Sequence, residues 1–426
     1  MTLDLLRFTT AGAVDDGKST LIGRLLYDSE QVFDDQLEHV ALASERRGGA
    51  GSLDLALLTD GLRAEREQGI TIDVAYRYFA TPARRFIIAD CPGHQQYTRN
   101  MVTGASTADV AVVLIDARKG VQEQSKRHAF LSALLGIPHL VVAINKMDLV
   151  DYSAQRFAEL AGEFDAFADN LWPGRGPAQA ARRITHVPIS ALHGDNVVAR
   201  SERMDWYEGP TLLHFLETVD VAYDHPYDRP ARFPVQWVIR PAAEGGPADY
   251  RAYAGQLSSG ALARGDEVVV LPGGGRTQIA AIDSYDGELD EAVAPMSFAL
   301  RLADELDVSR GELICRPDET ATVARELHAD VCWMTEQPLQ ARGRYVIKQT
   351  TRCASAVVDE IEDRVDVHTL ARVPDATQLQ LNDIGRVRLR TSVPLAFDPY
   401  TANRRTGSFI MIDADTNETV GAGLIN

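Results

Sequence analysis

The chain has 426 residues, of which 45% are hydrophobic and 24% charged, and its 43 basic and 61 acidic residues give a net charge of −18. This length accommodates roughly two to four domains. The acidic balance argues against a general nucleic-acid-binding surface, because phosphate contacts need clustered Lys and Arg. We find neither an apolar run of about 18 residues nor a signal-peptide pattern. We therefore expect a cytoplasmic protein that has no membrane partner.

The N-terminal segment combines an apolar, β-branched run with a glycine-rich turn. Residues 5–10 are followed by residues 12–19, which fit the phosphate-loop pattern G-x-x-x-x-G-K-[S/T]. Glycines let the backbone N–H groups face a phosphate, which the start of the following helix also attracts. Lys18 is expected to reach the β- and γ-phosphates, and the Ser19 hydroxyl to ligate Mg²⁺. The nucleotide-binding residues predicted here are Gly12, Val14, Asp15, Asp16, Gly17, Lys18, Ser19 and Thr20.

The first half of the chain alternates short apolar runs with longer helical patterns. Near-continuous hydrophobicity predicts strands buried on both faces, at residues 85–89, 110–115, 140–144 and 184–189. Helices are predicted at residues 124–135 and 154–167, and a further one is predicted to begin at Pro210. This alternation predicts an α/β domain over residues 1–225, with a mostly parallel sheet and helices on both faces.

The second half of the chain has a different pattern. Pro226, Pro230 and Pro234 mark a linker, after which short strands alternate with glycine turns. This alternation of short strands and glycine turns predicts two small β-barrel domains, over residues 232–320 and 322–426. Predicted strands are residues 233–239, 250–254, 267–271 and 277–282 in the first barrel, and 345–350, 385–390 and 408–412 in the second.

Three further motifs follow predicted strands of the first domain. Asp90 to Gly93 fits D-x-x-G, in which the carboxylate helps to hold Mg²⁺ and the glycine N–H contacts the γ-phosphate. Residues 145–148 fit N-K-x-D, and Asp148 there can accept two hydrogen bonds from guanine, which adenine cannot supply. A backbone N–H of residues 190–192 can bond the guanine carbonyl. The residues predicted from these motifs are Asp90, Gly93, Asn145, Lys146, Asp148, Ser190, Ala191 and Leu192.

These motifs, in this order, resemble the G domain of translational GTPases of the elongation factor Tu type. A G domain followed by two barrels covers nearly the whole chain. The resemblance implies that Thr71, in the segment E-R-E-Q-G-I-T-I, ligates Mg²⁺ when GTP is bound, and that His94 orients the hydrolytic water. It implies catalytic roles for His94, Lys18 and Thr71, Mg²⁺ ligation by Ser19, Thr71 and Asp90, and GTP or GDP with Mg²⁺ as cofactors.

Other segments are more similar to the GTP-binding subunits of bacterial sulfate adenylyltransferases. These segments are residues 12–20, with Asp16 where translation factors carry His, and residues 91–101, 403–413 and 419–423. This resemblance implies a GTPase that couples GTP hydrolysis to the formation of adenylylsulfate and pyrophosphate from ATP and sulfate. It also implies that adenylyl transfer occurs on a small catalytic subunit, which is the partner in a heterodimer or larger heteromer.

An aminoacyl-tRNA carrier is the alternative function. Arg342, Arg344, Lys348 and Arg352 could form a strip that contacts phosphates. The negative net charge of the chain instead favours the interpretation that this strip is the solvent-exposed face of a strand. It also argues against a nucleic-acid partner. A third interpretation, an ATP-specific enzyme, conflicts with the N-K-x-D motif that ends at Asp148, because this motif predicts guanine specificity.

Overall fold

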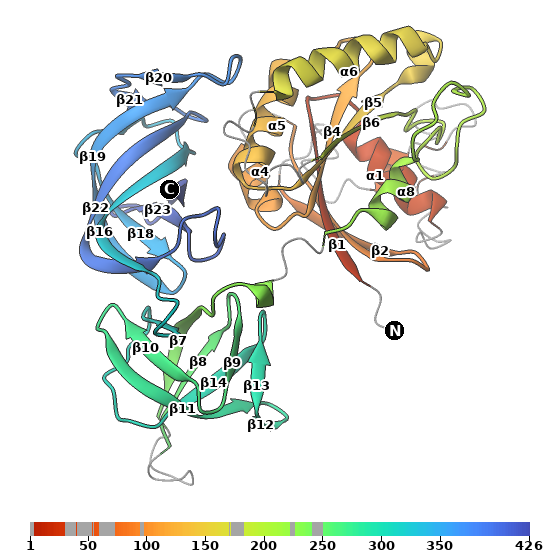
Figure 1. Cartoon of the computed structure of the whole chain (residues 1–426). Helices are drawn as coiled ribbons and strands as arrows, with labels where there is room; N and C mark the ends of the chain where they lie inside the picture. The colour runs from red at the N-terminus through yellow and green to blue at the C-terminus, as the bar shows by residue number, and fades with distance from the viewer. Residues whose placement is uncertain are drawn as a thin grey trace. The chain divides into compact units, whose positions relative to one another are not determined.

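The computed structural model describes residues 4–29, 40, 53, 55–58, 73–93, 98–169, 171, 183–221, 226–240 and 250–426. The chain forms two compact units, Met1–Val221 with Asp366–Ala371, and Ala222–Val365 with Arg372–Asn426 (Figure 1). The domain limits predicted above remain predictions. None of the described helices is long and apolar enough to cross a membrane.

The first unit is built on a six-stranded sheet of order β2-β3-β1-β4-β5-β6. All neighbours pair in parallel except β2, which is antiparallel to β3. Figure 1 shows α1 and α8 on one side of the sheet and α4 and α5 on the other. The α/β fold with a mostly parallel sheet is therefore confirmed. Its strands are β1 (Leu5–Gly12), β2 (Ala75–Ala80), β3 (Arg85–Asp90), β4 (Val110–Asp116), β5 (His139–Asn145) and β6 (Arg183–Pro188), and its helices are α1 (Lys18–Asp28), η1 (Leu55–Leu58), α4 (Thr98–Ala105), α5 (Glu123–Leu134), η3 (Met147–Val150), α6 (Ala154–Ala168) and α8 (Leu212–Thr218).

The core of this unit explains why the apolar runs become central strands. Every residue of β4 and β5 is buried, and α1 and α8 pack with β1 and β3 in one apolar cluster. The ends of β3 to β6, α5 and α6 lie within one residue of the predicted bounds. The start predicted for the last helix is wrong. Pro210 precedes the cap of α8, since the Thr211 hydroxyl accepts the His214 N–H at 3.2 Å and the helix starts at Leu212.

The second unit contains the two β-barrels, as predicted. In the first, β10, β15, β7, β8, β14 and β11 are neighbours in this order, and pairing of β10 with β11 closes the ring. In the second, the order β18-β23-β24-β16-β22-β19 is closed by pairing of β18 with β19. Closure leaves no open sheet edge in either ring. The strands are β7 (Phe233–Ile239), β8 (Ala252–Gln256), β9 (Ala261–Ala263), β10 (Glu267–Leu271), β11 (Gly275–Ser284), β12 (Gly287–Leu289), β13 (Glu291–Val293), β14 (Ser297–Leu302), β15 (Leu313–Cys315), β16 (Thr322–Trp333), β17 (Leu339–Gln340), β18 (Arg344–Gln349), β19 (Arg352–Val365), β20 (Arg372–Pro374), β21 (Gln378–Leu379), β22 (Ile384–Phe397), β23 (Ser408–Asp413) and β24 (Thr419–Ile425), preceded by η5 (Pro226–Asp228).

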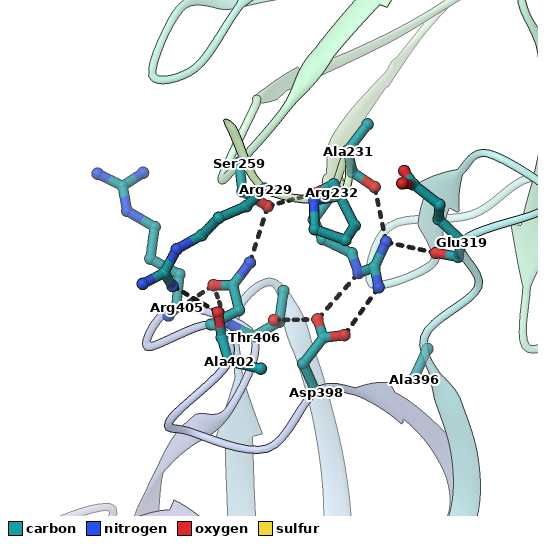
Figure 2. Close-up of polar contacts among 12 residues, drawn as sticks. Arg229, Ala231, Arg232, Ser259, Glu319, Ala396, Asp398, Ala402, Arg405 and Thr406 are labelled. Atoms are coloured by element: carbon teal, nitrogen blue, oxygen red, sulfur yellow. Dashed lines mark hydrogen bonds and ion pairs between the residues drawn. The ribbon is translucent and has the colours of Figure 1, made fainter. Parts of the chain in front are cut away.

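A buried ion pair joins the two barrels (Figure 2). Arg232, just before β7, donates from Nε and Nη2 to the two carboxylate oxygens of Asp398 at 2.9 and 2.8 Å. Its Nη1 donates to the carbonyls of Ala231 and Glu319. The Thr406 hydroxyl donates to the same carboxylate at 2.5 Å. Every arm of the guanidinium thus has an acceptor within the chain, as a buried charge requires.

The segment 403–413, which the sequence resemblance singled out, contributes directly to this barrel junction. Asn403 Nδ2 donates to Ser259 Oγ at 2.8 Å, and Arg405 Nη1 donates to Gln256 Oε1 at 2.7 Å. Asn403 is also buried. The described contacts of this segment therefore explain it as a structural element.

Candidate functional site

The predicted phosphate loop is a turn between a buried strand and a helix. β1 ends at Gly12 and α1 begins at Lys18. Gly17 has φ of 94°, a left-handed conformation that favours glycine, and a Cβ there would lie 2.5 Å from Asn145 Nδ2. Among the described residues no side chain caps α1, so the N–H groups of its first turn can face an anion. Val14, Asp15 and Asp16 lie in the turn, and Ser19 and Thr20 lie in the first turn of α1.

Lys18 is held over the turn by backbone carbonyls. Its Nζ donates to the oxygens of Gly12 at 3.1 Å and Ala13 at 2.9 Å. Burial lowers the pKa of Lys18, while the nearby carboxylates of Asp90 and Asp16 act in the opposite direction. Within the part of the chain that the structure describes, Lys18 has no ion pair. The site thus contains a buried cation that an anionic phosphate group would neutralise.

Asp90 and Gly93, of the predicted D-x-x-G motif, lie beside Lys18. Asp90 is the last residue of β3 and is buried, and its Oδ1 accepts a hydrogen bond from Thr10 at 3.2 Å. A Cβ on Gly93 would meet Lys18 Nζ and would lie 2.8 Å from the backbone carbonyl oxygen of Gly12, which explains the glycine at this position. Asp90 and Ser19 offer the hard oxygen ligands that Mg²⁺ prefers. The donor set is therefore compatible with the predicted metal ion.

The N-K-x-D motif is connected to two loops of the site. Asn145 Nδ2 donates to the Asp16 carbonyl at 2.8 Å, and its Oδ1 accepts the Ala191 N–H at 3.0 Å. Lys146 Nζ donates to the Asp15 carbonyl. Asn145 and Lys146 thus hold the phosphate loop, and Asn145 also holds the loop at residues 190–192.

Two of the residues predicted to recognise the base are in direct contact. Asp148 Oδ1 accepts the Ser190 hydroxyl at 2.6 Å, while Leu192 is 51% exposed. Ser190 is buried, so Asp148 is oriented from one side by a fixed donor. An oriented carboxylate is suited to a base that carries hydrogen-bond donors on its edge.

Two positioning residues were missed by the sequence analysis. Arg24 of α1 donates from Nε to the Ala191 carbonyl at 3.2 Å and from Nη2 to the Leu192 carbonyl at 2.5 Å. His128 of α5 accepts the Gly12 N–H on Nδ1 at 2.9 Å. Burial lowers the pKa of His128 to about 3, so the ring is neutral and able to accept. Neither residue lies in a recognisable motif, and only the folded chain brings them to the site.

Two predicted residues, Thr71 and His94, lie outside the described residues. The Mg²⁺ ligand at Thr71 and the catalytic role of His94 therefore stay predictions. In the described ranges no group of three or more His, Cys, Asp or Glu side chains could hold a metal ion.

Family models match two parts of the chain, and relatives match nearly all of it. The family described as "Elongation factor Tu GTP binding domain" matches residues 3–225, and "GTP-eEF1A C-terminal domain-like" matches residues 326–426. The chain is 56% identical to "Bifunctional enzyme CysN/CysC" of Mycobacterium tuberculosis, covering 99% of this chain and 67% of that protein. It is 50% identical to "Sulfate adenylyltransferase subunit 1" of Bacteroides thetaiotaomicron, over 99% and 86% of the two chains. The protein of that name from Vibrio vulnificus is 52% identical, with 99% and 86% coverage.

Proposed function

Because the chain belongs to the family of sulfate adenylyltransferase subunit 1, with an elongation factor Tu GTP-binding domain, we propose that it is the GTPase subunit of a heteromeric sulfate adenylyltransferase. The observation that carries this proposal is similarity at about half of all positions along nearly the whole chain. The elongation factor alternative is supported only by the wider family. The subunit uses GTP, and the complex forms adenylylsulfate and pyrophosphate from ATP and sulfate.

The described geometry supports binding of GTP or GDP by the first unit. Lys18 lies at the phosphate loop and offsets charge on the β- and γ-phosphates. Asp148, held by Ser190, reads the guanine edge. Mg²⁺ bound by Ser19, Asp90 and Thr71 supplies further positive charge beside the phosphates. His94 orients the attacking water.

The partner is a small catalytic subunit on which adenylyl transfer takes place. Formation of a mixed sulfate–phosphate anhydride is uphill, so the GTP and GDP states of this chain must interact differently with the states of the partner. The two subunits work together in the cytoplasm, as a heterodimer or larger heteromer.

The test of the division of labour is sulfate-dependent pyrophosphate release from ATP. It is measured with and without GTP, and with each subunit omitted in turn. We expect release only with both subunits, stimulation by GTP, and faster GTP turnover when the partner is present. Sulfate-dependent release by this chain alone contradicts the proposal. GTP-dependent capture of aminoacyl-tRNA would favour the alternative function.

Guanine specificity tests the base-recognition assignment separately. Asp148→Asn should weaken GTP binding and improve xanthosine triphosphate binding, since the amide can donate to the carbonyl of xanthine. Asp165→Asn, which alters an exposed carboxylate of α6 that contacts His186, is the matched control. Equal GTP affinities for Asp148→Asn and the parent would remove Asp148 from base recognition.

The role of His94 is tested by single-turnover GTP hydrolysis. His94→Ala should keep GTP affinity while hydrolysis slows on the order of tenfold to a thousandfold, the range for loss of one positioned group. An unchanged rate constant would exclude His94 from the reaction.

A further inference from the structure

Asp116 is a buried carboxylate that no nucleotide motif contains. It is the last residue of β4, and its side chain is fully buried. The parallel register of β4 and β5 places it beside Asn145. Its Oδ2 lies 3.0 Å from Lys146 Nζ and 2.7 Å from Arg118 Nη2. The carboxylate therefore bridges two cations at the edge of the sheet where the predicted nucleotide site lies.

Arg118 completes the hydrogen bonding of this carboxylate. The Arg118 backbone N–H and Nε both donate to Asp116 Oδ1, at 2.9 and 3.1 Å. Burial alone would raise the pKa of Asp116, but hydrogen bonds from Arg118 and Lys146 outweigh it and hold the pKa well below its ordinary value. Asp116 is thus a stable anion, and the cluster of three residues carries a net charge of +1.

Lys146 connects this cluster to the phosphate loop. The same ammonium that contacts Asp116 also donates to the Asp15 carbonyl. Its side chain is only 22% exposed, and its backbone adopts a left-handed conformation with φ of 64°. A free lysine side chain loses about 2 kcal/mol of rotamer entropy when it is fixed. In this chain Asp116 fixes it before any ligand arrives.

We propose that Asp116 and Arg118 are positioning residues for guanine nucleotide binding, and that they hold Lys146 on the phosphate loop through the Asp116 carboxylate. This inference rests on the proposed GTP site. Asp116 sets the ammonium position, and Arg118 offsets the charge of the carboxylate so that the cluster stays net positive. Loss of either should loosen the connection between the strand end, the guanine motif and the phosphate loop.

The test is a double-mutant cycle read out as the Kd for GDP, measured by calorimetry. Asp116→Asn keeps the side-chain size but removes the charge, and we expect the Kd to rise about tenfold, the lower range for a charge-assisted hydrogen bond. In a Lys146→Met background the same change should alter the Kd less than about twofold, because the group through which Asp116 acts is gone. A purely structural role would give equal losses in both backgrounds.

The control is Asp109→Asn, immediately before the other end of β4, where Asp109 Oδ2 accepts the Arg7 N–H at 2.8 Å. It should leave the Kd unchanged. If Asp116→Asn does not fold, Arg118→Met at a side chain that is 46% exposed carries the test, with a Kd increase of about twofold to fourfold that disappears in the Lys146→Met background. Failure of the parent chain to bind GDP would contradict the proposed function. Binding by the parent with no loss in the variants, or with equal losses in both backgrounds, overturns the inference alone.

Discussion

The phosphate loop and the barrel junction both bury a cation, but different groups neutralise it. Arg232 at the junction has Asp398 on two arms and backbone carbonyls on the third. Lys18 has only two carbonyl acceptors, and in the described part of the chain no ion pair. The first cation is neutralised within the protein, whereas we propose that an anionic ligand neutralises the second. A buried cation with a counter-ion in the chain, such as Arg232, therefore indicates a structural cluster. A buried cation without one, such as Lys18 in the described residues, indicates a binding site.

The largest effect should follow from breaking the complete cluster. Arg232→Ala leaves Asp398 as an uncompensated buried anion, and we expect the free energy of unfolding to fall by about 3–5 kcal/mol. Denaturant unfolding measures this loss. GDP affinity should not change, because the junction lies in the other unit. The double change Arg232→Met with Asp398→Leu should recover most of the stability, and failure to do so would indicate that packing at the junction outweighs the charges.

Lys18→Met should have the opposite effect, which is a loss of nucleotide affinity without a loss of stability. It removes the cation that we propose binds phosphate, so GTP affinity should fall on the order of a hundredfold, which isothermal titration can measure. Since burial disfavours the charged form of Lys18, the nucleotide-free variant should be as stable as the parent or more stable by about 1 kcal/mol. A variant that is strongly destabilised without nucleotide would contradict the contrast between the two clusters.

Burial of His128 gives the stability of the first unit a pH dependence. Its pKa is about 3 in the folded chain and near 6.5 when unfolded, so below pH 6.5 the unfolded state binds more protons. Stability should therefore fall as the pH decreases from about 6.5 toward 3, by about 2 kcal/mol at pH 5. His128→Asn retains an acceptor for the Gly12 N–H. Its free energy of unfolding should lack the part of the decrease at low pH that His128 causes. Identical pH profiles of parent and variant would exclude His128 as the source.

Much of the fold could be predicted because buried parallel strands carry near-continuous apolar runs, as β4 and β5 do. β2 was missed because it is an edge strand whose Tyr76 and Tyr78 are exposed, which removes that signal. The barrels were predicted from glycine turns and short alternating strands, but the full length of β22 was not, because its bulged register hides the alternation.

The site was predictable where residues lie in one sequence motif. Lys18, Asp90 and Asp148 belong to such motifs because phosphate and base contacts need fixed local spacing. Asp116, His128 and Arg24 were not predictable, since each acts on a segment that only tertiary structure brings near. The supporting groups of a site are set by strand order and helix packing, and local patterns do not encode them.

The smallest effects come from one matched pair of hydroxyl groups, each of which donates to a carboxylate. Thr406 donates to Asp398 at 2.5 Å in the junction, and Ser190 donates to Asp148 at 2.6 Å beside the predicted base. Both hydroxyl-bearing residues are buried. The two hydroxyl–carboxylate hydrogen bonds have the same chemistry. If removing them has different effects on stability and on GDP affinity, we infer that one carboxylate stabilises the fold and the other binds a ligand.

Thr406→Val should lower the free energy of unfolding by about 1–2 kcal/mol, the value of a hydrogen bond to a charged group, and leave GDP affinity unchanged. Ser190→Ala should raise the Kd for GDP about threefold to tenfold, because Asp148 loses the donor that orients it. Its stability should change by less than about 1 kcal/mol, since the solvent-facing side of Asp148 can hydrate. Denaturant unfolding and calorimetric titration with GDP, both in one buffer, measure the stability and the GDP affinity of the two variants. If Ser190→Ala lost stability but kept its GDP affinity, Asp148 would belong with the structural carboxylates.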